Sequence, residues 1–484
     1  MKLTSGHKWG VVKYAVLACV WLGLCTGADA QEQGARLPAR AIAFPKQTHP
    51  PQPGTQAAAP ASPDPPDSEH LTLRGAIALA LRSNLSVKVA ATQIDEAAGT
   101  QIRKESALMP KVTTESLANL QNRNLHAFGF GFGGFPIPLV VGPFSNYDFR
   151  FYVDQPVIDR RAYHTYEASK RNQDATKLTY QDTRDQVIRQ AAGYYLDAEA
   201  SASEVEAAAA RVVTSRALEK LALDQHASGL ATGVDVLRAQ VQLRKDEQSL
   251  LVAQQGYDTA LLTLQRYIGV RPGAPIALAE KLSFRPLSPP EIEQARTVAL
   301  QARADYRSLH AQREALVEQQ KASRARYLPT LSVSGNYGGL GRNLGELPGT
   351  GLIQGTLAFT VFDHDRSGEA REVSSRVARV DAQISDLELG IEQDLRKAII
   401  DLHSAEQQVA VTAAAEELAR SELKLSEDRF RNGVTDNIEV ITAQSSLASA
   451  QDDHIMALAR HADARIALAR ALGATEQILD GFLP

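Results

Sequence analysis

SGLATGVDVLRAQ (Ser228–Gln240) and RNGVTDNIEVITAQ (Arg431–Gln444) are two copies of one motif, and they decide the fold. Gly229 aligns with Gly433 at an offset of 433 − 229 = 204 positions. Two further pairs keep this offset at the ends of a longer stretch: Asp159 with Asp363, and Gly269 with Gly473. A constant offset over such a length indicates an internal duplication.

Upstream the offset changes, because Pro110 aligns with Pro329 at 329 − 110 = 219 positions. The first copy therefore carries 219 − 204 = 15 extra residues, which we assign to a loop at 123–146. The predicted order in each copy is helix, strand, loop, strand, very long helix, tight turn and helix. We place the first repeat at 71–285, the second at 286–473, and a C-terminal tail at 474–484.

Heptad spacing of apolar and small residues predicts two helices of roughly 70 residues, on the order of 100 Å each, at about 159–226 and 363–430. Short Gly-containing turns then allow only an antiparallel return, in helices at about 234–268 and 438–472. The first helix of each copy, 72–108 or 290–326, is expected to stack end to end with the returning helix against the long one. The fold class is mainly α with a small β part.

Apolar and polar residues alternate in short segments, the period of a strand with one apolar face. Each segment is about 9 to 11 residues long, the reach of a tilted membrane strand. Four strands per chain cannot close a barrel, so spanning requires assembly: two chains give eight strands, and three give twelve with an open lumen. The residues expected to face lipid are Tyr147, Phe149, Phe151, Val153, Leu331, Val333, Leu357 and Phe359.

The N-terminal part reads as an export signal followed by a tether. Residues 1–30 combine a basic start, an apolar run and Ala28-Asp29-Ala30, as in a cleaved signal peptide. Residues 31–70 are rich in Pro, Ala and Gln, a composition that predicts disorder. Both cysteines, Cys19 and Cys25, lie inside the leader, so redox and thiolate–metal chemistry are not expected. Lipidation at Cys19 is the competing interpretation.

The chain resembles the TolC-type outer-membrane factors from Leu71 to Leu472. The duplication carries the resemblance, with two strand-to-helix junctions, Pro156–Asp159 and Thr360–Asp363, Leu328-Pro329, and the two Gly turns. It implies a homotrimer whose 12-stranded barrel lies in outer-membrane lipid and continues into the periplasm as a tube of helices. It also implies a periplasmic adaptor and an inner-membrane pump of the RND, ABC or MFS type as partners. The 484 residues carry a net charge of −4, which does not suggest nucleic acid.

The resemblance also implies a constriction at the turns. By position, Glu439, Asp436 and Asp235 are the expected gate carboxylates. Gly229, Thr232, Gly433 and Thr435 are the expected contacts with the partners. The family's second acidic position is Thr442 here, and its aromatic hydroxyl and arginine are replaced by Phe430 and Thr435. The strength of an acidic gate is therefore open.

Simpler interpretations remain beside these. The junction residues Asp159 and Asp363 are expected to be helix N-caps, and Asp436 and Glu439 can simply complement a helix N-terminus. No metal, cofactor or enzymatic constellation is expected. The Phe/Gly-rich segment 128–135 suggests an outer-surface loop. The alternative function is an exported periplasmic adaptor or structural coiled coil, and the transported substrate cannot be inferred.

Overall fold

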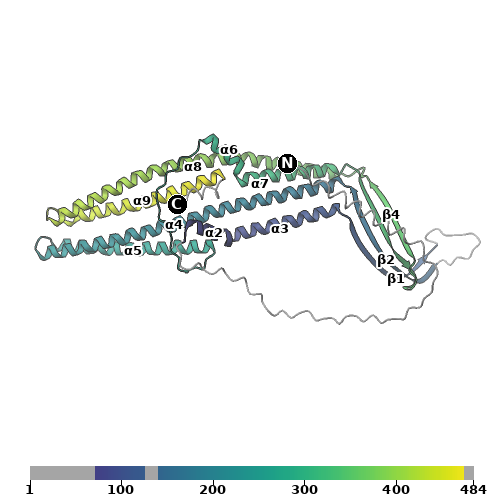
Figure 1. Ribbon diagram of the computed structural model, residues 1–484, viewed down its shortest axis with the longest axis horizontal. Helices are drawn as coiled ribbons and strands as arrows, with labels where there is room; N and C mark the ends of the chain where they lie inside the picture. The colour runs from purple at the N-terminus through teal and green to yellow at the C-terminus, as the bar shows by residue number, and fades with distance from the viewer. Residues whose placement is uncertain (1–70, 126–139, 474–484) are drawn as a thin grey trace, which may run out of the picture. The chain divides into compact units, whose positions relative to one another are not determined.

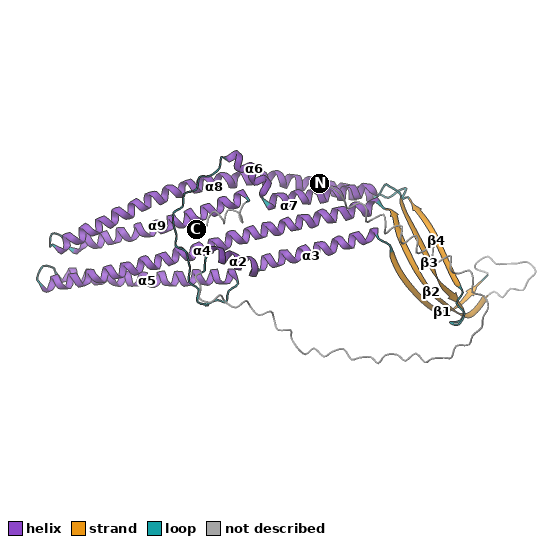
Figure 2. Ribbon diagram, viewed as in Figure 1, coloured by secondary structure: helices purple, strands orange, loops and turns teal. Residues whose placement is uncertain are grey.

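The computed structural model of the protein describes residues 71–125 and 140–473. The predicted signal peptide, tether, Phe/Gly-rich segment 128–135 and tail lie outside these residues. In chain order the elements are α2 (Leu73–Ser83), α3 (Leu85–Glu105), η1 (Ser106–Leu108), β1 (Lys111–Asn124), β2 (Val140–Ile158), α4 (Arg160–Ala227), α5 (Gly233–Ile268), α6 (Ile292–Ala302), α7 (Ala304–Ala325), β3 (Thr330–Gly341), β4 (Gly349–Ala358), α8 (Asp365–Arg431) and α9 (Asn437–Leu472) (Figures 1 and 2).

Two long helices organise the helical part. Helix α4 has 68 residues and α8 has 67, so each spans on the order of 100 Å. Helices α3 and α5 pack along different parts of α4, as predicted, and α7 and α9 lie between α4 and α8 (Figure 1). Across the helix layer, α3 and α5 therefore form one edge and α8 forms the other. Between them lie first α4 and then α7 and α9.

The first helix expected in each copy is in fact broken in two. Asn84 separates α2 from α3 with ψ of 134°, and its side chain caps α3 by accepting from the Ser86 amide at 2.8 Å. Arg303 separates α6 from α7 with ψ of 122°. The continuous helices predicted at 72–108 and 290–326 were wrong because extended residues interrupt each one.

Both breaks receive the end of a returning helix. Helix α5 ends at Gly269 with φ of +74°, and α9 ends at Gly473 with φ of +71°. A Cβ added at Gly269 would collide with the Ser83 side chain, and one at Gly473 would lie 2.7 Å from the Arg303 nitrogen. Glycine is required at both positions by the left-handed backbone and by the close approach.

The strands form one antiparallel sheet in the order β1-β2-β3-β4. Strand β2 has 19 residues, because Val140 to Phe144 continue its pairing with β1 across a shift in register near Gln121. The loop expected at 123–146 was therefore too long. Strand β4 ends at Ala358, so Phe359 lies just beyond the sheet and not within it.

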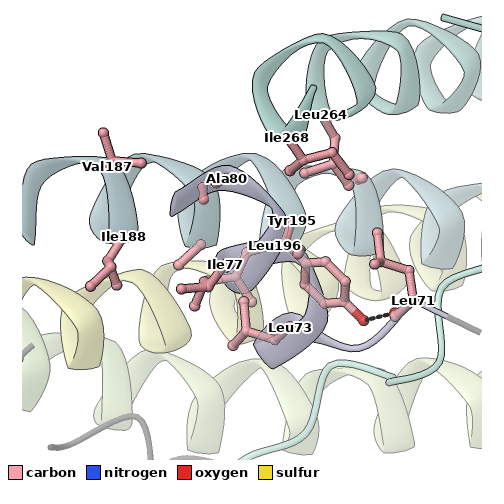
Figure 3. Packing of buried hydrophobic residues seen from close by; sticks show 14 of the residues in the cluster. Leu71, Leu73, Ile77, Ala80, Val187, Ile188, Tyr195, Leu196, Leu264 and Ile268 are labelled. Carbon is pink, nitrogen blue, oxygen red and sulfur yellow. Dashed lines mark hydrogen bonds between the residues drawn. The ribbon is translucent and has the colours of Figure 1, made fainter. Parts of the chain in front are cut away.

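Apolar residues at heptad spacing fill the contacts between the helices. The largest described cluster joins α2, α4 and α5, with Ile188, Tyr195 and Leu264 fully buried (Figure 3). A second cluster joins α6, α8 and α9 around Ile391 and Leu395. A third lies where the ends of α4, α5, α8 and α9 meet, next to the two helix turns.

Candidate functional site

The turn between α4 and α5 is closed by local hydrogen bonds. Gly229 adopts φ of +74°, and the Leu230 amide donates to the Gln225 carbonyl at 2.9 Å. Thr232 and Asp235 then form a reciprocal cap: the Asp235 amide donates to Thr232 Oγ1, and Asp235 Oδ2 accepts from the Thr232 amide at 2.9 Å and from its hydroxyl at 2.6 Å. Asp235 is only 7% exposed, so its carboxylate serves its own helix.

These hydrogen bonds set the electrostatics of Asp235. Donation from the Thr232 hydroxyl lowers the pKa of Asp235 below its ordinary value, and Arg238 acts in the same direction. Burial acts in the opposite direction, but the net effect is a lowered pKa. Asp235 therefore stays ionised to lower pH than an ordinary aspartate and acts as a structural cap.

The turn between α8 and α9 has the same backbone but different side-chain partners. Gly433 adopts φ of +69°, and the Val434 amide donates to the Arg429 carbonyl at 2.9 Å. Asp436 is the N-cap of α9 and accepts from the Ile438 amide at 3.2 Å. The Glu439 carboxylate is therefore not used as the cap of α9.

Glu439 instead projects from the first turn of α9. Its Oε2 accepts from the Thr435 hydroxyl at 2.6 Å, and its Oε1 lies 3.0 Å from an Arg429 nitrogen. The Glu439 side chain remains 34% exposed. Thr442 donates only to the Ile438 carbonyl within its own helix, so no second carboxylate joins Glu439 at that position.

The two turns lie side by side and are tied by amide side chains. Asn437, which is fully buried, donates to the Asp235 carbonyl at 2.5 Å. Gln225 donates to the Phe430 carbonyl at 2.9 Å, and the Phe430 ring is 3% exposed within the cluster at the helix ends. Sequence reasoning missed Asn437 and Gln225, because no local pattern reveals a contact between residues about 200 positions apart.

The sheet has one apolar face, and its register shows which residues share it. Val153 pairs with Val112 and Gly335, and Phe151 pairs with Thr114 and Tyr337. Residues two positions apart in a strand point to the same face. By this register one face carries all the predicted lipid-facing residues that lie within strands: Tyr147, Phe149, Phe151, Val153, Leu331, Val333 and Leu357.

The two strand-to-helix junctions differ. Asp159 is the N-cap of α4 and accepts from the Ala162 amide at 2.8 Å. Asp363 is not the N-cap of α8; that position is His364, and the helix begins at Asp365. The predicted N-cap position was wrong by one residue, because the helix begins at Asp365; Asp363 Oδ1 still accepts from the Asp365 amide at 3.1 Å. Its Oδ2 pairs with Arg326 at 2.5 Å, and Arg326 also contacts Asp365 and Glu369.

Within residues 71–125 and 140–473, no group of three or more His, Cys, Asp or Glu side chains is arranged to hold a metal ion. The same described residues include no helix long and apolar enough to cross a membrane.

The geometry defines a class of protein: two long antiparallel helix pairs joined to a small antiparallel sheet, as in known outer-membrane channels. The fold is similar to that of the Campylobacter jejuni CmeC outer membrane channel, with a TM-score of 0.73 and 15% identity, over 83% of this chain and 86% of that one.

The outer membrane efflux protein family model matches residues 76–270 and 296–474, and the chain belongs to this family. Its members are outer-membrane channels and not enzymes, which confirms both the predicted location in the outer membrane and the absence of an enzymatic role. The resemblance to TolC-type factors is confirmed as well.

The chain is also similar to two curated relatives. Protein CyaE of Bordetella pertussis is 24% identical over 59% of this chain, and alkaline protease secretion protein AprF of Pseudomonas aeruginosa is 21% identical over 62%. The chain spans 62% and 64% of the lengths of these two relatives.

Proposed function

We propose that the protein is the channel subunit of an efflux or secretion system and that three copies form one closed conduit. The observation that carries this proposal is the sheet, which has an apolar face and ends in two edge strands, β1 and β4. Unpaired backbone groups at such edges cost several kcal/mol each in lipid. Pairing β4 of one copy with β1 of the next removes every edge, and three copies give a 12-stranded barrel with an open lumen.

The helices support the same assembly. Helix α8 carries a row of aliphatic side chains that are each 65 to 72% exposed: Leu389, Ile400, Val411, Leu418 and Leu425. Helix α5 carries Val234, Leu237, Val241 and Val252, each 55 to 68% exposed. These two helices lie at opposite lateral edges of the helix layer, so a ring of copies would bury both rows and continue the conduit into the periplasm.

We also assign residues 71–285 and 286–473 to two repeats of one unit. The support is the repeated element order, in which a broken helix, two strands, a long helix and a return helix follow one another twice. The equivalent returning helices α5 and α9 both have 36 residues.

In this proposal the two turns form the periplasmic end of the conduit. Gly229, Thr232, Gly433 and Thr435 would meet an adaptor and an inner-membrane pump, while Glu439 and Asp436 would face the constriction. Substrate would pass by diffusion, with the pump as the energy source. The name of AprF supports a polypeptide as one class of cargo.

The assembly is tested by charging the row on α8. A Leu418→Glu, Leu425→Glu double variant should lose the trimer in native mass spectrometry of detergent-purified protein, because both carboxylates would be buried between copies. Val213→Glu is the matched control. Val213 is 67% exposed, but it lies on α4, which is not at an edge of the helix layer. A trimer that survives the double variant as well as the control would contradict the assembly.

The gate is tested by single-channel conductance in planar bilayers. Glu439→Ala should lower the preference for cations, because it leaves the positive charge of Arg429 without its partner. Arg429→Ala should raise that preference. Glu422→Ala, on an exposed part of α8, should change neither. Unchanged selectivity in both Glu439→Ala and Arg429→Ala would remove the gate assignment and leave the conduit intact.

A further inference from the structure

The segment 270–291 connects α5 to α6, and we call it the strap. It is held against the helices by the backbone of Leu71, whose amide donates to the Ala277 carbonyl at 2.7 Å and whose carbonyl accepts from the Ala279 amide at 3.0 Å. The Tyr195 hydroxyl on α4 donates to the same Leu71 carbonyl at 2.9 Å (Figure 3). Apolar strap residues, Ile276, Leu278 and Leu282, pack on the cluster below.

One buried group under the strap has no structural explanation so far. Glu199 lies one helical turn after Tyr195 on α4 and is 4% exposed. Its Oε1 has no hydrogen-bond partner among the described residues. The charge that acts on Glu199 is the carboxylate of Glu280, a strap residue. A buried ionised carboxylate that lacks a donor and faces a like charge is costly.

We propose that Glu199 is a protonation-dependent clamp on the strap. When protonated, its carboxyl group carries an O–H that can donate to the Glu280 carboxylate across the helix–strap contact. When the proton leaves to solvent, two negative charges face each other under the strap. Lifting the strap then relieves the repulsion and lets water reach Glu199.

The direction of the pH effect follows from the environment of Glu199. Burial, and then the charge of Glu280, raise the pKa of Glu199 from its ordinary value to about 7. The closed form therefore binds the proton more tightly than a form with the strap lifted. The stabilisation of the closed strap is complete below the ordinary pKa range of a glutamate. It is lost as pH rises through about 7.

Other titratable groups at the strap act differently. Lys281 forms an exposed ion pair with Glu206 at 2.8 Å, and this pair does not involve Glu199. The ring of Phe284 packs on His461 with centroids 4.9 Å apart. Burial and the charge of Arg465 lower the pKa of His461, so its protonation would weaken the strap on the acid side, opposite to Glu199. Measurements at pH 6 and above separate the two.

The test is hydrogen–deuterium exchange of strap peptides in the purified full chain, at pH 6 and pH 8.5. Wild type is compared with Glu199→Gln at each pH, so that the intrinsic pH dependence of exchange cancels. The amide of the variant stays neutral, and its strap should remain closed at both values. The ratio of wild-type to variant exchange should be roughly ten times larger at pH 8.5 than at pH 6.

Two controls keep the proposal open to refutation. Glu206→Gln removes the exposed pair with Lys281 and should change strap exchange equally at both pH values. Unchanged circular dichroism would show that each variant folds. A wild-type to Glu199→Gln ratio that is the same at pH 6 and pH 8.5 would overturn the clamp. So would Ca²⁺ that restores strap protection at pH 8.5 in wild type but not in Glu199→Gln, because the pair would then hold a cation.

Discussion

The two helix turns share a backbone and differ in how each uses its acidic residue. Asp235 and Glu439 occupy the same place after their turns, 204 positions apart in the sequence. Asp235 folds back on Thr232 and is buried, whereas Glu439 is one methylene longer and reaches Arg429 on the preceding helix. In the second turn Asp436, the counterpart of Thr232, caps α9 by accepting from the Ile438 amide, so the cap does not use Glu439. Of the two carboxylates, only Glu439 is not used to cap its helix, and it can therefore face Arg429 and solvent.

Phe430 gives the largest expected difference between the turns. Its ring is 3% exposed at the meeting of four helices, and its counterpart 204 positions earlier is the exposed His226. Phe430→Ala should lower the free energy of unfolding by about 3 to 5 kcal/mol, since it leaves a cavity. His226→Ala should leave it nearly unchanged. Urea unfolding at fixed protein concentration measures both, and equal losses would mean that the turns are packed alike.

Asn437 comes next, because it joins the turns directly. Asn437→Ala removes the donor to the buried Asp235 carbonyl and should cost about 1 to 3 kcal/mol. Asn432→Ala is the matched control, since that amide is exposed and donates only within its own helix end. Urea unfolding measures the stability of both variants. Hydrogen exchange at both turns should become faster in Asn437→Ala and stay unchanged in Asn432→Ala. Exchange that rises in only one turn would show that the tie does not couple them.

The smallest expected effect separates the two carboxylates. Asp235→Ala should cost about 0.5 to 2 kcal/mol through loss of the cap, and Glu439→Ala about 0 to 1 kcal/mol as a half-exposed ion pair. Because the pKa of Asp235 is lowered, its contribution is present above the ordinary aspartate range and lost as pH falls through the folded-state value. The difference between wild type and Asp235→Ala should therefore shrink when unfolding is measured in acid. A difference that persists at pH 2 would argue against a charged cap.

Periodicity in the sequence was sufficient to predict the long helices, the returning helices and the apolar face of the strands. Each of these depends on local pattern alone. The breaks at Asn84 and Arg303 were missed because neither residue is a strong helix breaker, and each is held by the end of another helix. Strand β2 was shortened because the extra residues of the first copy were assigned to a loop, although its pairing with β1 resumes beyond Gly142 and Pro143. Asp363 was named as the N-cap one residue too early, because the sequence pattern does not show that α8 begins at Asp365 and not at His364.

The broken helices have a mechanical consequence. Helices α5 and α9 stop where α2 meets α3 and where α6 meets α7, so among the described elements only α4 and α8 run without interruption from the strands to the turns. These two helices connect the turns to the sheet as continuous rods, whereas the helices beside them are divided at Asn84 and Arg303, where each break packs against the end of α5 or α9. Each chain thus has two unbroken struts of nearly equal length, and the seams in the helices beside them are bridged by those struts.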